Sequence, residues 1–461
     1  MDRYQFVVIG AGPAGEAAAH KARELGASVA VVDRGWFGGS CPHIGCVPSK
    51  SLLHSASVRW AGGDESWQQA SERRDYMVNR AADAAEPDDS SHVASLEEAG
   101  AATFRGEARI VGRGRVRVDG SGGTRELETD NVVVAIGSSS KVPPIDGLAA
   151  TRPWTNREAT LARELPRSML VLGGGPTGVE LAQVFVRFGV PTSIVQSGAR
   201  LLPTDHPRNA EAVTEALKRD GVAVRTGVRA QRARAGAGSD GAHVVELDDG
   251  STAEGHVILL AVGRSFELNR IGLEHYGLDP STRDGVPHDG RLRVTEGLWI
   301  AGDAAGPELH THQGHYQGEL AVRMALGEDV TPDYRALPRA TYTDPEAAFV
   351  GHSLETARKA GVDAFELVAD FAQTAKGYSV EAELGHVTVV VDRASRELVG
   401  AAMAVPDASA AIHECVLAIK AHVPVDVLAE TIHAFPSTSR ILNGLFADAR
   451  RELDRPGSIV G

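Results

Sequence analysis

One pattern occurs twice in this chain: an apolar strand, a glycine-rich turn, a helix and a second apolar strand. The first copy begins with Phe6–Ile9 and ends its second strand in Asp33, and the second copy begins with Ser168–Leu172 and ends in Gln196. In such a unit the glycines allow a tight turn and let a dinucleotide pyrophosphate approach the helix N-terminus. Two copies therefore predict two doubly wound α/β domains, each with a nucleotide site. The glycines of the two turns are Gly10, Gly12 and Gly15, and then Gly173, Gly175 and Gly178.

Acids and glycines at strand ends extend both predicted sites. Asp33 lies 18 residues after Gly15 and is placed to accept hydrogen bonds from a ribose hydroxyl. An ordinary glycine-rich turn is the alternative explanation, but the acid completes the fingerprint. Two later apolar strands end in Gly137 and Gly263, each late in its own half, and a third strand leads to Asp303 just past a glycine.

The region after about residue 337 has no glycine fingerprint. Its strand-like runs His386–Val391 and Leu398–Met403 are followed by helical stretches at 409–421 and 424–431. This order predicts an α+β domain without a nucleotide site of its own.

The chain has only three cysteines, and two of them, Cys41 and Cys46, lie just downstream of the first glycine turn. A zinc site would need more thiolates or histidines at regular spacing, so no resident metal is expected. The pair therefore predicts a redox-active disulfide that faces a flavin, and two unpaired buried thiols are the alternative. So few cysteines form no extracellular framework, and we expect the protein in the cytoplasm, where a close cysteine pair is usually catalytic.

Charge and hydropathy exclude other kinds of partner. The net charge of -14 argues against nucleic acid, whose backbone needs a basic surface. No apolar run approaches the length of a membrane span. The N-terminus runs directly into a strand, which leaves no room for a signal peptide.

Together these features resemble the pyridine nucleotide–disulfide oxidoreductases, the group of dihydrolipoamide dehydrogenase, glutathione reductase and mercuric reductase. The resemblance covers nearly the whole chain and extends to Tyr342–Glu346, which opens the last domain. It implies an FAD-binding domain of residues 1–150 and 280–335, an NAD(P)-binding domain of residues 151–279, and a C-terminal α+β dimerisation domain of residues 336–461. It also implies a homodimer whose active sites take residues from both subunits.

The resemblance also implies roles for the site residues. Cys46 would be the flavin-facing charge-transfer thiol and Cys41 the interchange thiol that meets the substrate. The family pairs Lys50 with Glu180 close to the flavin and nicotinamide; a solvated lysine and a solvated glutamate are the alternative. Asp303 would bind the FAD ribityl chain, with a turn-forming aspartate as the alternative. Further implied cofactor contacts are Gly39 and Gly137 for FAD and Gly263 for NAD(P).

The nicotinamide coenzyme is weakly marked. An acid at the end of the second strand of the second fingerprint would favour NADH, but that position holds Gln196. No carboxylate there would repel a 2′-phosphate, and Arg200 is a candidate to bind one. We therefore lean toward NADPH, while a solvated Arg200 is an equal alternative.

The chain departs from the family near its C-terminus. The family's His-Pro-x-x-x-Glu motif reaches the partner's thiols with an acid/base histidine that the glutamate orients. Here Phe435 occupies the histidine position and Arg440 the glutamate position, which puts ordinary lipoamide or glutathione turnover in doubt. In an extended segment His433 shares a face with Phe435, so it is a candidate to replace the acid/base histidine. The interpretation that we favour is a histidine that orients the loop.

We therefore expect an FAD-dependent enzyme that passes electrons from NAD(P)H through Cys41 and Cys46 to a low-molecular-weight disulfide, a metal ion or a quinone. A mercuric reductase-like enzyme is one alternative, although the chain ends without a cysteine pair and Cys415 lies in an apolar helix. The resemblance to 2-ketopropyl-coenzyme M oxidoreductase/carboxylase is partial and includes His43. This residue is a candidate to lower a thiol pKa, and a histidine on the helix surface is an equal alternative. A non-catalytic flavoprotein redox sensor is the alternative of another class.

Overall fold

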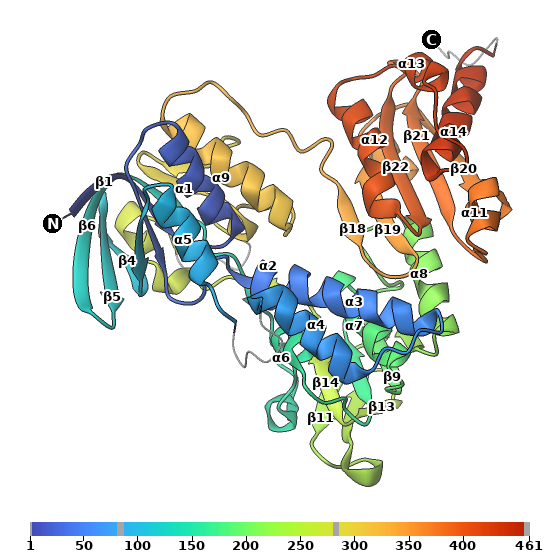
Figure 1. The fold of residues 1–461 in the computed structure, drawn as a ribbon, viewed down its shortest axis with the longest axis horizontal. Coiled ribbons are helices and arrows are strands. Elements are labelled where there is room, and N and C mark those ends of the chain that lie inside the picture. Colours follow the sequence, from blue (N-terminus) through green and yellow to red (C-terminus); the bar gives the residue numbers. More distant parts are fainter. Residues whose placement is uncertain (1, 81–86, 280–284, 456–461) are drawn as a thin grey trace.

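The computed structural model describes residues 2–80, 87–279 and 285–455 (Figure 1). The predicted domain boundary at residue 280 and the last six residues lie outside the described residues. The predicted fold class is confirmed: two parallel sheets flanked by helices precede an antiparallel sheet with its own helices.

The first parallel sheet has the strand order β17-β6-β1-β2-β3, with β16 as an antiparallel edge. Residues Phe6–Ile9 of the central strand are buried on both faces, as expected for a strand between two layers. On one face, α1 (Pro13–Glu24) and α9 (Thr311–Ala325) lie side by side (Figure 1). The strands of this sheet, including the antiparallel extension β4-β5, are β1 (Asp2–Ile9), β2 (Val29–Asp33), β3 (Ala102–Arg105), β4 (Glu107–Gly112), β5 (Arg115–Gly120), β6 (Gly123–Val134), β16 (Arg293–Thr295) and β17 (Leu298–Ile300).

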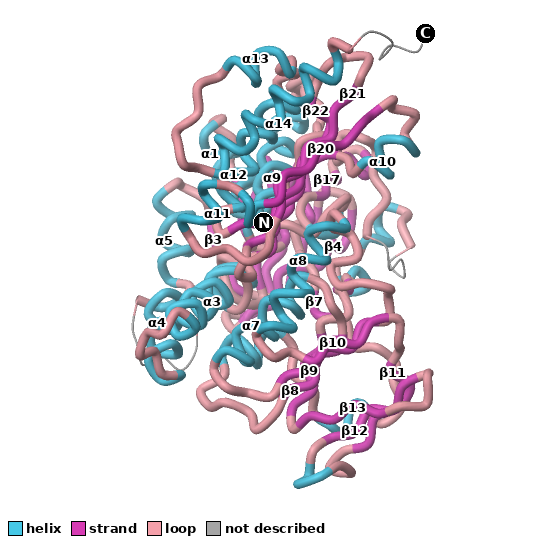
Figure 2. Tube along the Cα trace, turned by 90° about the vertical axis from the view of Figure 1, so that its right-hand side faces the viewer, coloured by secondary structure: helices cyan, strands magenta, loops and turns pink. Residues whose placement is uncertain are grey.

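The second parallel sheet repeats the arrangement with the order β10-β9-β8-β14. A three-stranded antiparallel sheet of β11, β12 and β13 lies next to it (Figure 2). Its elements are β8 (Met169–Leu172), α7 (Pro176–Arg187), β9 (Thr192–Gln196), α8 (Pro207–Arg219), β10 (Ala223–Thr226), β11 (Ala230–Arg234), β12 (His243–Leu247), β13 (Thr252–Gly255) and β14 (Val257–Leu260).

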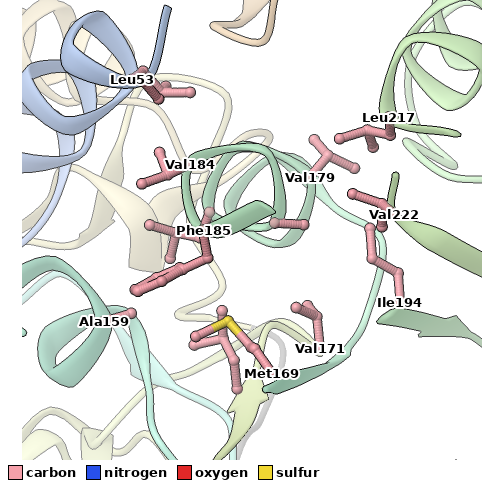
Figure 3. Packing of buried hydrophobic residues seen from close by; sticks show 14 of the residues in the cluster. Leu53, Ala159, Met169, Val171, Val179, Val184, Phe185, Ile194, Leu217 and Val222 are labelled. Atoms are coloured by element: carbon pink, nitrogen blue, oxygen red, sulfur yellow. The ribbon is translucent and has the colours of Figure 1, made fainter. Parts of the chain in front are cut away.

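Helix α7 is buried on nearly every side. Val179 points toward Leu217, and Phe185 points toward Met169 of the sheet (Figure 3). Val184 points toward Leu53 of α3 (Cys46–Trp60). An amphipathic surface helix would expose one face. The burial of α7 follows from its position between the sheet and α3.

The last sheet is antiparallel in the order β18-β19-β22-β21-β20 and has α12, α13 and α14 beside it (Figure 1). It confirms the α+β prediction for this region. Its elements are β18 (Arg339–Thr341), β19 (Glu346–Gly351), α10 (Leu354–Lys359), β20 (Ala364–Asp370), α11 (Ala375–Ser379), β21 (His386–Asp392), β22 (Leu398–Val405), α12 (Ala408–Lys420), α13 (Val425–Glu430) and α14 (Thr438–Leu453).

A helical segment connects the two nucleotide units. Helix α3 begins at Cys46 and packs against both α4 and α7. The remaining elements are α2 (Ser40–His43), α3 (Cys46–Trp60), α4 (Trp67–Asn79), α5 (Ser90–Glu98), β7 (Ser139–Ser140), α6 (Asn156–Leu161) and β15 (Arg264–Ser265). No helix within the described residues has the length and apolar character needed to cross a membrane.

Candidate active site

The first glycine turn joins β1 to α1 and packs closely against other backbone. Gly10 has a φ of 105°, and a Cβ there would lie 2.3 Å from the carbonyl oxygen of Ala135. A Cβ on Gly39, where φ is 69°, would lie 2.7 Å from the Cα of Gly12. Only glycine fits both positions, and this close packing is what a dinucleotide cradle requires.

A pocket beside this turn is lined by Gly10, Asp33 and Gly137, which are expected to contact FAD. Asp33 lies in its wall, and its carboxylate accepts hydrogen bonds of 2.7 Å from the backbone of Ala11 and Gly35. Burial raises the pKa of Asp33, but its remaining lone pairs can accept from ribose hydroxyls. The sequence pattern singled out Gly10, Asp33 and Gly137 of this wall; it did not identify Arg34, Gly106, Glu107, Ala108, Ser138, Glu267 and Arg270.

Asp303 lies in a polar cluster near that pocket. The hydroxyl of Ser138 donates a hydrogen bond to its carboxylate, and Nε of Arg264 lies 3.6 Å from it. Arg264 also donates to the backbone oxygen of Ser138, over 2.6 Å. The three side chains come from segments far apart in the chain, which is why Ser138 carried no local signal. Their arrangement fits an FAD ribityl or phosphate contact.

Cys41 and Cys46 lie together, and both are free thiols in this structure. A hydrogen bond from the Cys41 thiol lowers the pKa of Cys46 to about 6, with further contributions from Thr311 and the Lys50 cation. The Thr311 hydroxyl lies 3.6 Å from the Cys46 sulfur. Cys46 is also the first residue of the 15-residue helix α3, where the helix dipole favours a thiolate. The same pairing raises the pKa of Cys41, so near pH 7 Cys46 is the thiolate and Cys41 the thiol.

Lys50 and Glu180 form an ion pair of 2.7 Å between α3 and α7. The Glu180 side chain is 5% exposed, and its second oxygen accepts a 2.9 Å hydrogen bond from the backbone of Tyr342. The Lys50 ammonium lies 4.5 Å from the centre of the Tyr342 ring. Burial opposes the charge of Lys50, but Glu180 outweighs it and raises the pKa of Lys50. These contacts differ from the solvated alternative and match the arrangement that the family resemblance implies.

Two histidines flank Thr311 at the start of α9 and were not predicted from the sequence. The rings of His310 and His312 stack with centroids 5.0 Å apart. Burial, with a smaller effect of His312, lowers the pKa of His310 to about 4. His310 is therefore neutral near pH 7 and holds no proton to donate there as an imidazolium.

The second glycine turn repeats the geometry of the first. A Cβ on Gly173 would lie 2.2 Å from the carbonyl oxygen of Ala261, whereas a Cβ on Gly175 or Gly263 would meet nothing within 4 Å. Gln196 ends β9, and its side-chain oxygen accepts a 3.0 Å hydrogen bond from the backbone of Gly174. The glutamine therefore occupies the acid's place in the turn without its charge.

Arg200 is engaged within its own loop. Its guanidinium donates to the carbonyl oxygens of Pro203 and Asp205, each over 3.2 Å. These bonds orient the loop after β9, so the guanidinium is partly committed before a coenzyme binds.

The C-terminal loop displays Phe435, which is 73% exposed in the single chain. His433, two residues earlier, has one ring nitrogen 2.8 Å from the carbonyl oxygen of Thr431 and the other 2.6 Å from Glu414. Arg440 donates to Asn443. Both ring nitrogens of His433 thus have partners in their own subunit, which supports the interpretation that His433 orients the loop.

His43 and Cys415, the remaining candidate residues, are both buried. His43 is buried, contacts the carbonyl oxygen of Phe37 over 2.8 Å and packs against His92. Cys415 is fully buried, and burial raises its pKa, so it is a core thiol. Among the residues that the structure describes, no three His, Cys, Asp or Glu side chains converge as a metal site.

Comparison with known proteins agrees with this geometry. The sequence profile of the pyridine nucleotide–disulphide oxidoreductases matches residues 4–318, and that of their dimerisation domain matches residues 337–444. A dihydrolipoyl dehydrogenase of Chlorobaculum tepidum is 30% identical and aligns over 98% of each chain. The chain therefore belongs to the pyridine nucleotide–disulphide oxidoreductase family: it is an FAD- and NAD(P)H-dependent oxidoreductase with a dimerisation domain.

Two solved structures share the fold over almost their full length. LpdA of Mycobacterium tuberculosis is 27% identical with a TM-score of 0.85, and the match covers 98% of this chain and 99% of that one. A mutant of the HOCl-induced flavoprotein disulfide reductase RclA of Escherichia coli, solved as a Cu(II) complex, is 25% identical with a TM-score of 0.87, over 97% and 99% of the two chains.

Proposed function

We propose that this chain is an NAD(P)H-dependent dithiol reductase whose acceptor is a thiophilic metal ion. The observation that carries the proposal is a Cys46 thiolate, with its pKa lowered to about 6, in a chain where Phe435 and Arg440 replace the proton-transfer dyad. When bound, FAD supplies the step that converts hydride from the nicotinamide into an electron pair for the disulfide. Oxidation of the Cys41 thiol and the Cys46 thiolate to the disulfide then releases two electrons, and it releases one proton to solvent. The two electrons reduce one metal ion by two or two metal ions by one each.

Each residue at the site has a separate role in this electron transfer. Cys46, at the start of α3, is held as a thiolate by Cys41, Thr311 and Lys50. Cys41 is the exchange thiol that meets the acceptor. Glu180 keeps Lys50 protonated and in place. A thiolate next to a thiol is a ligand pair suited to a soft metal.

The acceptor class follows from proton supply. Reduction of a disulfide substrate needs a proton for each leaving thiolate, whereas reduction of a metal ion does not. His433 is committed to Glu414 and Thr431, and His310 is neutral near pH 7. The RclA mutant, which shares this fold, was solved as a Cu(II) complex, and this binding of a metal ion by a similar protein supports the proposal.

The test is steady-state NADPH and NADH oxidation by the FAD-loaded enzyme with Cu(II), Hg(II), a quinone or lipoamide as acceptor. We expect metal-dependent turnover that is largely lost in Cys41→Ala and Cys46→Ala, and slow lipoamide turnover. Fast lipoamide turnover would contradict the proposal, and quinone turnover that survives in both cysteine variants would mean that the pair is not the electron outlet.

We further propose that the enzyme prefers NADPH, since the neutral Gln196 does not repel a 2′-phosphate. We propose that it acts as a homodimer in the cytoplasm, where thiols stay reduced between turnovers. The ratio of kcat/KM for NADPH and NADH tests the coenzyme preference, and the molecular mass in solution tests the homodimer.

A further inference from the structure

Helix α7 carries a row of three buried polar side chains. Glu180, Gln183 and Arg187 are spaced three and four residues apart, so they share one face of the helix. As whole residues, Glu180, Gln183 and Arg187 are only 4%, 0% and 7% exposed. All three bond to the short segment Tyr342–Asp344 that precedes β19. Buried polar groups are costly unless paired, and here each one is paired with the same segment.

Gln183 and Arg187 hold Asp344 at three points. The amide of Gln183 accepts from the backbone N–H of Asp344 over 2.7 Å and donates to its carbonyl oxygen over 3.0 Å. Arg187 donates to the Asp344 carboxylate over 2.9 Å. Both side chains also donate to Asp220, which fixes them from the other side. The peptide at Asp344 is therefore gripped by its backbone and by its side chain.

The segment then carries this constraint to the ion pair. Two residues before Asp344, Tyr342 donates its backbone N–H to Glu180 and lies with its ring 4.5 Å from the Lys50 ammonium. Lysine has a long flexible stem, so its charge acts at a fixed place only where neighbours hold it. Tyr342 and Glu180 are those neighbours.

We propose that Gln183 and Arg187 are positioning residues that act through the segment Tyr342–Asp344. They hold the Lys50 cation in its place beside Glu180, one helical turn after Cys46 on α3. This inference rests on the proposed function, in which Cys46 works as a thiolate. Neither residue touches the thiols. The groups that interact electrostatically with the Cys46 thiol come from each element around it. They are Cys41 on α2, Lys50 on α3, Glu180 on α7, Thr311 on α9 and Tyr342 before β19.

The test measures the Cys46 titration in the FAD-loaded protein, with Cys41→Ser in every sample so that one thiol of the pair remains. Gln183→Met keeps the size of the side chain and removes both bonds to the Asp344 backbone. Asp344→Ala removes only the carboxylate held by Arg187, and it keeps the test available where Gln183→Met does not fold. The matched control is Asn209→Leu, a fully buried amide on α8 that bonds to Ala348, Asp205 and His386 and not to the segment or the thiols.

Two readouts separate the two claims. The first is the pH midpoint of the rate at which iodoacetamide labels Cys46, followed by peptide mass spectrometry. We expect Gln183→Met to raise this midpoint by about 0.5–1 pH unit. The Lys50 cation would no longer be held in place, and a thiol pKa rises when a nearby cation moves away. Asp344→Ala should raise it less, and Asn209→Leu should lower thermal stability without moving it.

The second readout is the long-wavelength thiolate-to-flavin absorbance of the same samples. Its absence in protein carrying only Cys41→Ser would contradict the proposed function, because Cys46 would not face the flavin. The positioning inference would be overturned by a labelling midpoint that is unchanged in both Gln183→Met and Asp344→Ala, or that moves equally in Asn209→Leu.

Discussion

Cys41 and Cys46 are chemically unequal although they belong to one short motif. The Cys46 sulfur accepts a hydrogen bond from the Cys41 thiol and faces Thr311 and Lys50 at the start of α3, so the pKa of Cys46 falls to about 6, whereas the same pairing raises the pKa of Cys41. The thiolate of Cys46 is therefore present at neutral pH and is lost as the pH falls through about 6. The motif alone identified the pair, but it could not identify Thr311, which lies beside the Cys46 sulfur although it is 265 residues away in the chain.

Thr311→Val tests the contribution of that hydroxyl. Without its hydrogen bond the pKa of Cys46 should rise by about 0.5–1 unit, so the thiolate disappears at a higher pH during acidification. The measurement is the pH titration of the long-wavelength absorbance of the two-electron-reduced enzyme. Thr311→Ser, which keeps the hydroxyl, is the control, and identical midpoints for valine and wild type would contradict the assignment.

Gln196→Glu tests the coenzyme site. The carboxylate keeps the bond to Gly174 but repels a 2′-phosphate, so kcat/KM for NADPH relative to NADH should fall about tenfold or more, equivalent to roughly 1.4 kcal/mol. Arg200→Met separates the two candidate residues. Because Arg200 bonds to Pro203 and Asp205, its loss should affect both coenzymes alike. A selective loss of NADPH in Arg200→Met would instead assign the phosphate to Arg200.

At the scale of elements, the nucleotide turn is held by the contact between α1 and α9. A Cβ on Gly318 of α9 would lie 2.1 Å from the carbonyl oxygen of Ala14, in the first turn of α1. The two helices approach so closely only because Gly318 has no side chain. Since α1 begins at the first glycine turn, this packing also positions the turn that is expected to bind FAD.

Gly318→Ala should therefore push α1 away from α9. We expect a loss of about 1–3 kcal/mol in the free energy of unfolding, as for other overpacked sites, and faster release of FAD. Thermal unfolding and flavin release measure both effects. Gly444→Ala on α14 is the matched control: a Cβ there meets nothing within 4 Å, so alanine should be neutral or stabilising by up to about 1 kcal/mol. Equal effects of the two changes would contradict the packing argument.

The sequence predicted the features that depend on local patterns and missed those that depend on contacts between distant parts of the chain. The glycine turns, Asp33 and the cysteine pair are local patterns, and their elements formed where the spacing placed them. Ser138 and Thr311 join the site through contacts with partners 165 and 265 residues away, and spacing carries no information about such contacts. His433 was identified as a candidate, but only the fold shows that both of its ring nitrogens are already occupied.

At the scale of the whole molecule, the C-terminal loop exposes apolar side chains that a single chain does not cover. Ile432 is 97% exposed and Phe435 is 73% exposed, on a loop fixed by His433, Glu414 and Asn443. Two large apolar side chains on a rigid loop mark an interaction surface. The chain carries the family's dimerisation domain, so a second copy is the expected cover, and Phe435 is then expected to face the partner's thiols in place of an acid.

Restoring the dyad tests whether that replacement sets the choice of acceptor. Phe435→His with Arg440→Glu recreates the His-Pro-x-x-x-Glu pattern, and a positioned acid typically contributes about 100-fold or more to a step that releases a thiolate. We therefore expect NAD(P)H-dependent lipoamide reduction to rise by about that factor in the double variant. Phe435→His alone should gain less, because Arg440 cannot accept a hydrogen bond from the imidazole and so leaves it unoriented. The gain should also fall at high pH, where the new histidine has lost its proton. A double variant that folds, dimerises and binds FAD but reduces lipoamide no faster than wild type would mean that the shape of the thiol site, and not its proton supply, selects the acceptor.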